Sequence, residues 1–193
     1  MENQNTNVLI VGVGGQGTLL TSRIIAQVAV AMGYDVKVSE VHGMAQRGGS
    51  VVSQVRFGSR VYSPIIKKGD ADYLLAFEKL EAARWLDYLQ PEGMVIINDE
   101  RVDPLPVMTG KAKYPGDITD KIAKAVTNTR VVDASAIAQS CGNIKAANVV
   151  LVGMFAALAG FSPEKVKNAI QQLVPEKALG INLLAFEKGY QLI

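Results

Sequence analysis

A glycine-rich turn near the start of the chain restricts the possible folds more than any other feature. It matches the pattern G-x-G-x-x-G and consists of Gly12-Val13-Gly14-Gly15-Gln16-Gly17. The aliphatic segment 7–13 before it predicts a buried parallel strand. The proline-free segment 16–32 after it predicts a well-buried helix that ends near Gly33. With a second strand expected at 35–41, these elements make a βαβ unit, with which Rossmann-like folds begin.

The rest of the sequence continues this alternation of strands and helices. Further strands are expected at 73–77, 93–97 and 130–133. Helices are expected at 79–89, 120–127, 135–140, 146–159 and 182–188, and after Ser162-Pro163-Glu164, where the serine hydroxyl would cap the first turn. The segments 51–57 and 60–62 flank Gly58-Ser59 and predict a hairpin. We therefore expect one domain over residues 1–193 with an α/β, Rossmann-like three-layer fold, a mainly parallel sheet and an inserted β-hairpin.

The composition excludes several classes of protein. One cysteine, Cys141, and one histidine, His42, cannot alone hold an iron–sulfur cluster, which needs about four thiolates, or a His-rich zinc site. The net charge of +2 is too small to indicate nucleic-acid binding. The longest apolar run, 149–160, is too short to cross a bilayer, and the polar segment 1–7 carries no secretion signal. We expect a cytoplasmic protein that contacts neither nucleic acid nor membrane.

Three interpretations of the glycine turn are open on spacing alone. Glycines let backbone N–H groups approach an anion at the start of a helix, and Thr18 can donate a further hydrogen bond. The bound group could be NAD or FAD, with Glu40 on the ribose hydroxyls. It could instead be another anionic group, or the glycines could serve only close strand–helix packing. No lysine follows the turn, which argues against a P-loop.

A second glycine-rich segment decides the interpretation. It follows the second expected strand and runs Glu40-Val41-His42-Gly43-Met44-Ala45-Gln46-Arg47-Gly48-Gly49-Ser50. Together with the first turn it closely resembles the gamma-type domain of pyruvate and 2-oxoisovalerate:ferredoxin oxidoreductases, and is most similar to the indolepyruvate branch of that family. Three further features fit the same family: Gly69-Asp70-Ala71-Asp72, Glu78 and Asn182-x-x-Ala185-Phe186-x-x-Gly189. The resemblance covers essentially the whole chain.

The resemblance implies a subunit of a thiamine-diphosphate-dependent 2-oxoacid:ferredoxin oxidoreductase of anaerobic metabolism. Such enzymes decarboxylate a 2-oxoacid, here indolepyruvate or another aryl pyruvate, to an acyl-CoA and reduce ferredoxin. The Gly-Asp-Gly signature of thiamine diphosphate sites is missing, because Ala71 follows Gly69-Asp70 and Ile118 follows Gly116-Asp117. We therefore expect thiamine diphosphate, magnesium and iron–sulfur clusters on a larger alpha subunit, and no activity from this chain alone. The alternative is a stand-alone Rossmann protein that uses NAD or FAD, and a homo-oligomer is left open.

The candidate site residues lie on the two glycine-rich segments, which we expect to meet at the C-terminal ends of the strands. The first segment, an anion-binding loop, comprises Gly12, Gly14, Gly15, Gln16, Gly17 and Thr18. The second, directed toward the partner subunit or coenzyme A, comprises Gln46, Arg47, Gly48 and Gly49.

Two residues of the second segment are candidates for a part in catalysis. Arg47 precedes two glycines, so its guanidinium can reach a carboxylate or phosphate. It can equally pair with Glu40 or Glu78 and fix its own loop. His42 is a candidate proton carrier, or a hydrogen-bonding loop residue. No metal ligand is predicted.

Overall fold

The computed structural model describes residues 5–41 and 48–193. Its six strands form one sheet in the order β2-β3-β1-β4-β5-β6. The strands are β1 (Thr6–Val13), β2 (Asp35–Glu40), β3 (Ser50–Gly58), β4 (Ala71–Ala76), β5 (Leu89–Asn98) and β6 (Thr129–Val132).

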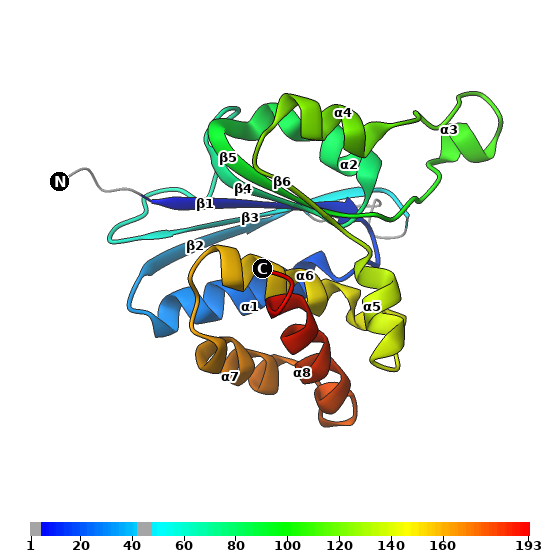
Figure 1. Ribbon diagram of the computed structural model, residues 1–193. Helices are drawn as coiled ribbons and strands as arrows, with labels where there is room; N and C mark the ends of the chain where they lie inside the picture. Colours follow the sequence, from blue (N-terminus) through cyan, green and yellow to red (C-terminus); the bar gives the residue numbers. More distant parts are fainter. Residues whose placement is uncertain (1–4, 42–47) are drawn as a thin grey trace.

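Helices cover both faces of the sheet, which gives three layers (Figure 1). On one face lie α2 (Lys79–Arg84) and α4 (Ile118–Ala125), and on the other lie α1 (Thr18–Ala31), α5 (Ala134–Ser140), α6 (Ala147–Leu158), α7 (Pro163–Leu173) and α8 (Glu176–Tyr190). The short elements are η2 (Leu86–Tyr88), α3 (Leu105–Met108) and η3 (Ile144–Ala146). This arrangement confirms the expected three-layer α/β fold.

The sheet departs from a purely parallel one at β3. This strand pairs antiparallel with both β1 and β2, whereas β1, β4, β5 and β6 pair in parallel. The connection 41–49 between β2 and β3 is too short for a parallel crossover, which needs about a dozen residues or more. The inserted hairpin is therefore formed by β2 and β3. The prediction that 60–62 is its second arm was wrong, because these residues form no strand.

Alternation along β1 explains how the sheet is buried on both faces. Val8 and Ile10 belong to the hydrophobic cluster under α1, α6 and α8, whereas Leu9 and Val11 belong to the cluster under α2 and α4. All four side chains have no exposed area, because successive side chains of a strand point to opposite faces. A central strand of a sheet with helices on both faces therefore appears in the sequence as an uninterrupted aliphatic run.

The C-terminal helices pack backbone against backbone. A β-carbon on Gly153 of α6 would lie 2.4 Å from the carbonyl oxygen of Phe186 on α8, and one on Gly189 would lie 2.0 Å from the carbonyl oxygen of Val150. Ala185 and Phe186 are buried in the same contact. The C-terminal motif of the sequence is thus a packing motif, and α8 is longer than the helix expected at 182–188.

Two local predictions need correction. Ser162 precedes α7 as expected, but its hydroxyl donates to Glu164 at 2.7 Å and makes no capping bond to the backbone. The helix expected at 79–89 stops at Arg84, and the rest of that range forms the 3-10 turn η2 and the first residue of β5. Across the described residues, no helix is long and apolar enough to span a membrane.

Candidate functional site

The two glycine-rich segments meet through their backbones. The N–H of Gly14 donates to the carbonyl oxygen of Gly49 at 2.9 Å, and the N–H of Gly48 donates to that of Gly14 at 3.4 Å. These bonds continue the β1–β3 ladder, whose last pair is Val13 with Ser50, beyond the strands. For Gly48 and Gly49, the described end of the second segment, the structure thus bears out the expected position beside the first segment at the C-terminal end of β1.

The side chain of Gln16 closes the first glycine turn from inside. Its Oε1 accepts the N–H of Val13 at 2.7 Å, and its Nε2 donates to the carbonyl oxygen of Phe77 at 3.2 Å. It therefore fastens the end of β1 to the end of β4. Both polar groups of this side chain are engaged by the fold.

Gly17 places the start of α1 against α6. Its φ of 89° lies in the left-handed region, and a β-carbon there would lie 2.6 Å from Nδ2 of Asn148. As the N-cap residue it offers no side chain to the first turn of α1, which also contains no acidic residue. The first amides of this helix have no carbonyl partner within the helix and carry its partial positive charge.

The N-terminus of α6 lies beside it but is built differently. The 3-10 turn η3 runs directly into α6: Oδ1 of Asn143 accepts the N–H of Lys145 at 3.0 Å, and the N–H of Ala147 donates to the carbonyl oxygen of Ile144. The first turn of α6 contains no acidic residue. Lys145, exposed to solvent, adds a full positive charge immediately before it. Because Asn148 of α6 touches Gly17, the positive ends of α1 and α6 lie side by side.

Both helix starts line a cavity of about 330 Å³ with mixed polar and apolar walls. It is lined by Gly15, Gln16, Gly17, Phe77, Asn98, Glu100, Ser135, Ile144, Lys145 and Ala147. The carboxylate Oε2 of Glu100 accepts Nδ2 of Asn98 and the Ser135 hydroxyl, both at 2.9 Å. The cavity therefore combines the N-terminus of α1 and Lys145, which favour an anion, with one held carboxylate, which can accept hydroxyl or amino hydrogens.

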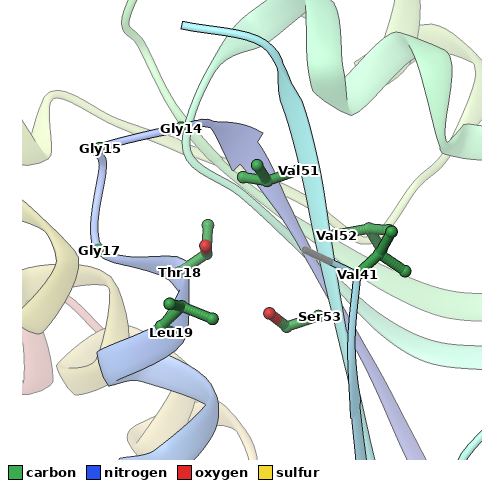
Figure 2. Close-up of a pocket in the computed structure, with 9 residues that line it drawn as sticks. All are labelled: Gly14, Gly15, Gly17, Thr18, Leu19, Val41, Val51, Val52 and Ser53. Atoms are coloured by element: carbon green, nitrogen blue, oxygen red, sulfur yellow. The ribbon is translucent and has the colours of Figure 1, made fainter. Parts of the chain in front are cut away.

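On the other side of the glycine turn lies a more apolar cavity of about 320 Å³ (Figure 2). Thr18 and Leu19 of α1 face Val41 and the β3 residues across it. The full lining is Gly14, Gly15, Gly17, Thr18, Leu19, Val41, Val51, Val52 and Ser53. Apart from the hydroxyl side chains of Thr18 and Ser53, its walls are apolar, and none of the described residues that line it carries a carboxylate that could bind a ribose as in a dinucleotide site.

The position of Glu40 also differs from that in a dinucleotide site. Its Oε1 accepts the Ser22 hydroxyl at 2.9 Å, so this carboxylate ties the end of β2 to α1. In a dinucleotide-binding fold the second strand adjoins the first. Here β3 separates them, so Glu40 is on a strand roughly 10 Å from β1 instead of about 5 Å. The topology thus favours the anchoring role for Glu40 over ribose binding.

A buried acidic cluster supports the second glycine segment. The Ser50 hydroxyl donates to Oε2 of Glu81, and Arg84 pairs with Oε1 of the same residue at 3.2 Å. Burial raises the pKa of Glu81, and the neighbouring Glu78 carboxylate raises it further, against the opposing effects of Ser50 and Arg84. Glu78 itself caps α2 through the N–H of Glu81 at 2.9 Å.

The structure describes some of the predicted site residues and not others. It places Gly12 to Thr18 and the Gly48–Gly49 pair at one edge of the sheet. His42, Gln46 and Arg47 lie outside the described residues. Sequence reasoning missed Lys145 and Glu100. The signal for Lys145 was a basic residue just before an apolar helix whose first turn contains no acidic residue.

The thiamine diphosphate and metal signatures do not fit this chain. Asp70 precedes β4, at the opposite edge of the sheet from the glycine segments, and Asp117 precedes α4. Cys141 is buried at the end of α5. No group of three or more metal-ligating side chains occurs within ranges 5–41 and 48–193.

Comparison with known proteins gives consistent matches. The profile of the family described as "Pyruvate ferredoxin/flavodoxin oxidoreductase" matches residues 7–192. The "Indolepyruvate oxidoreductase subunit IorB" of Thermococcus kodakarensis is 41% identical over 190 residues, which cover 95% of this chain and 93% of that protein. The protein of the same name from Archaeoglobus fulgidus is 42% identical over 188 residues, with the same coverage.

Among solved structures, the fold matches one domain of a longer enzyme chain. This is the 2-oxoglutarate:ferredoxin oxidoreductase from Magnetococcus marinus, determined with 2-oxoglutarate, coenzyme A and succinyl-CoA bound. The TM-score is 0.76 at 22% identity, and the match covers 99% of this chain but 31% of that chain. The fold therefore also occurs as a part of a larger polypeptide.

Proposed function

Because the chain belongs to the pyruvate ferredoxin/flavodoxin oxidoreductase family and is thus a subunit of a 2-oxoacid oxidoreductase, we propose that it is the smaller subunit of an indolepyruvate:ferredoxin oxidoreductase. The complex would convert indolepyruvate or another aryl pyruvate, with coenzyme A, to the acyl-CoA and carbon dioxide. Its two electrons would pass to ferredoxin in the cytoplasm. The identity of more than 40% to two IorB subunits over nearly the whole chain supports this substrate class.

The redox cofactors of this reaction belong, in this proposal, to the larger alpha subunit. Thiamine diphosphate with magnesium supplies the decarboxylation chemistry, and iron–sulfur clusters carry the electrons. The single buried cysteine and the misplaced Gly-Asp pairs of this chain support that division. The contribution of this chain is therefore to bind and orient a substrate at the edge of its sheet.

Coenzyme A is the substrate that suits this edge best. The observation that carries the assignment is that the N-terminus of α1, which has no capping side chain, opens on the same cavity as Lys145 at the η3–α6 junction. Backbone N–H groups and an ammonium group together favour phosphate oxygens. Glu100, held by Asn98 and Ser135, can accept a hydroxyl or amino hydrogen from the same ligand.

The second glycine segment would complete this site toward the partner. Gly48 and Gly49 adjoin Gly14, so the residues just before them in the chain, Gln46 and Arg47, are proposed to face bound substrate. Arg47 would hold a carboxylate or phosphate, and His42 remains a candidate proton carrier. The chain alone is expected to show no oxidoreductase activity.

Reconstitution with the larger subunit tests the function. The complex should reduce ferredoxin with indolepyruvate and coenzyme A, and neither subunit should do so alone. Activity with no aryl pyruvate in a panel of 2-oxoacids would refute the substrate assignment. Turnover by the isolated chain would refute its role as a non-redox subunit.

Two variants test the coenzyme A site within that complex. The Lys145→Ala variant should raise the KM for coenzyme A about tenfold, because a charge-assisted hydrogen bond contributes about 1.5–3 kcal/mol, and leave the KM for the 2-oxoacid unchanged. Lys177→Ala, which removes an exposed lysine of α8, is the matched control. Arg47→Ala should impair the use of coenzyme A or of the 2-oxoacid. Wild-type KM values in both Lys145→Ala and Arg47→Ala would refute the proposed coenzyme A site.

A further inference from the structure

A short arm, residues 101–114, extends from the same edge of the sheet as the glycine segments (Figure 1). It follows the C-terminal end of β5 and carries α3 near its tip. Its turn is closed by main-chain bonds from Met108 to Pro104 at 3.1 Å and from Ala112 to Pro106 at 3.0 Å. The arm is thus a folded element of its own.

The base of the arm is fixed to the body by one buried carboxylate. Glu78, 1% exposed, accepts the N–H of Val102 at 3.3 Å and the hydroxyl of Tyr114 on the same oxygen. The guanidinium of Arg101 lies 4.4 Å from the centre of the Tyr114 ring and pairs with Asp103 at 2.6 Å. Both ends of the arm are therefore held in place, and its tip is presented in a defined position.

The tip exposes large apolar side chains. Leu105 is 71% exposed and Met108 is 73% exposed. They are three positions apart on α3 and therefore lie on the same face of this helical turn. Lys111 and Lys113 follow, both exposed, and neither forms an ion pair with any residue that the structure describes. The tip thus combines an apolar contact surface with uncompensated positive charge.

We propose that this arm is the docking element for the larger subunit, with Leu105 and Met108 inserted in an apolar groove that acidic side chains border. The proposal rests on the proposed function, which supplies the larger subunit. In the Magnetococcus enzyme the matched fold is about a third of one chain, whereas this chain nearly spans its IorB relatives. Where this fold is a separate chain, its attachment to the rest of the enzyme depends on surface contacts alone.

The location of the arm argues for the same partner. A cavity of about 190 Å³ lies between the arm and the second glycine segment, lined by Gly48 and Gly49 on one side and by Pro104 and Leu105 on the other. A partner that brings its cofactor to a substrate held at the glycine segments must cover this edge. The arm is then the first part of the chain that it meets. A prepositioned arm loses little conformational entropy on binding, which favours a stable contact.

A double variant tests the apolar contact. In the co-purified complex, Leu105→Glu with Met108→Glu should raise the dissociation constant for the larger subunit about tenfold or more. The reason is that two apolar side chains, buried in the proposed interface, become charged. The matched control is Val30→Glu with Leu184→Glu, two exposed apolar residues of α1 and α8 on the opposite face of the sheet, which should bind as wild type. Far-UV circular dichroism and Tm confirm that both variants are folded.

A second variant tests the charge. Lys111→Glu with Lys113→Glu should slow association and reduce its dependence on salt. Wild-type affinity and salt dependence in both arm variants would overturn the proposal. So would an arm variant that alters self-association of the chain, measured by sedimentation, while binding the larger subunit normally. If the wild-type chain itself fails to bind the larger subunit, the proposed function fails first, which separates the two outcomes.

Discussion

A β-carbon on Gly17 would lie 2.6 Å from the side-chain amide of Asn148, so the first turns of α1 and α6 are in direct contact. This contact brings two helix N-termini to one edge of the sheet. Packing against Asn148 thus requires a residue without a side chain at position 17. The same position is where the glycine turn is expected to bind an anion. The two interpretations of the motif are compatible, because the same close approach that excludes a side chain concentrates backbone donors.

Replacing Gly17 should separate these helices. We expect Gly17→Ala to destabilise the protein by about 2–4 kcal/mol, since it adds a steric clash with Asn148 to the strain of a left-handed φ of 89°. Gly33→Ala is the control, because Gly33 has the same φ of 89° but a β-carbon there meets nothing within 4 Å. Urea denaturation should show a larger loss for Gly17→Ala, and equal losses would contradict the contact with Asn148.

The contact between α6 and α8 should be equally intolerant of a methyl group. Gly189→Ala would place its β-carbon 2.0 Å from the Val150 carbonyl oxygen, and we expect a loss of about 3 kcal/mol. Gly180 lies on the same helix, and a β-carbon there meets nothing within 4 Å. Gly180→Ala should therefore stabilise the protein by about 0.5–1 kcal/mol through helix propensity. Thermal unfolding of both variants distinguishes them, and two effects of the same sign would refute the packing argument.

Gln16 should matter for the junction of β1 and β4. Gln16→Ala removes the acceptor of the Val13 N–H and the donor to the Phe77 carbonyl oxygen, and we expect a loss of about 1–3 kcal/mol. Gln16→Glu keeps an acceptor for Val13 but loses the donor to Phe77, so it should destabilise as well. Amide hydrogen exchange at Val13 measures the first bond directly. It should accelerate in Gln16→Ala more than in Gln16→Glu, and unchanged exchange in both variants would show that this bond does not hold the turn.

The buried carboxyl of Glu81 should make stability depend on pH. Burial, followed by repulsion from Glu78, raises its pKa in the folded state above the ordinary value of 4.5. The native state therefore holds this proton more tightly than the unfolded state. Stability contributed by Glu81 is greatest below pH 4.5 and falls as pH rises through the raised pKa. Glu81→Gln keeps an acceptor for the Ser50 hydroxyl and removes this penalty, so it should gain stability relative to wild type as pH increases.

Denaturant unfolding between pH 4 and 8 measures this difference. A control with the opposite sign is Glu164→Gln, because the Ser162 hydroxyl lowers the pKa of Glu164. The contribution of Glu164 is present above its unfolded pKa and is lost as pH falls through the lowered folded value. A Glu81→Gln variant whose stability relative to wild type is independent of pH would contradict the raised pKa.

Local sequence patterns predicted most of the elements. The aliphatic run of β1, the glycine turn and the proline-free α1 depend on periodicity and on turn chemistry, which neighbouring residues specify. The rule that strand ends meet at one edge of an α/β sheet predicted that the two glycine segments adjoin, and Gly48 and Gly49 do lie beside Gly14. The role of the Asn182 to Gly189 motif, by contrast, became clear only when α8 was seen against α6.

The sequence by itself therefore determined the alternation of strands and helices, the burial of β1 on both faces and the membership of a family. The tertiary structure decided that β3 enters between β1 and β2, that Glu40 is thereby moved away from the first turn, and that Lys145 lines the cavity at the start of α1. The physical reason is the sequence separation over which the interactions act. Side-chain period and turn residues act over a few positions, whereas strand order and the approach of α1 to α6 depend on contacts between residues far apart in the chain.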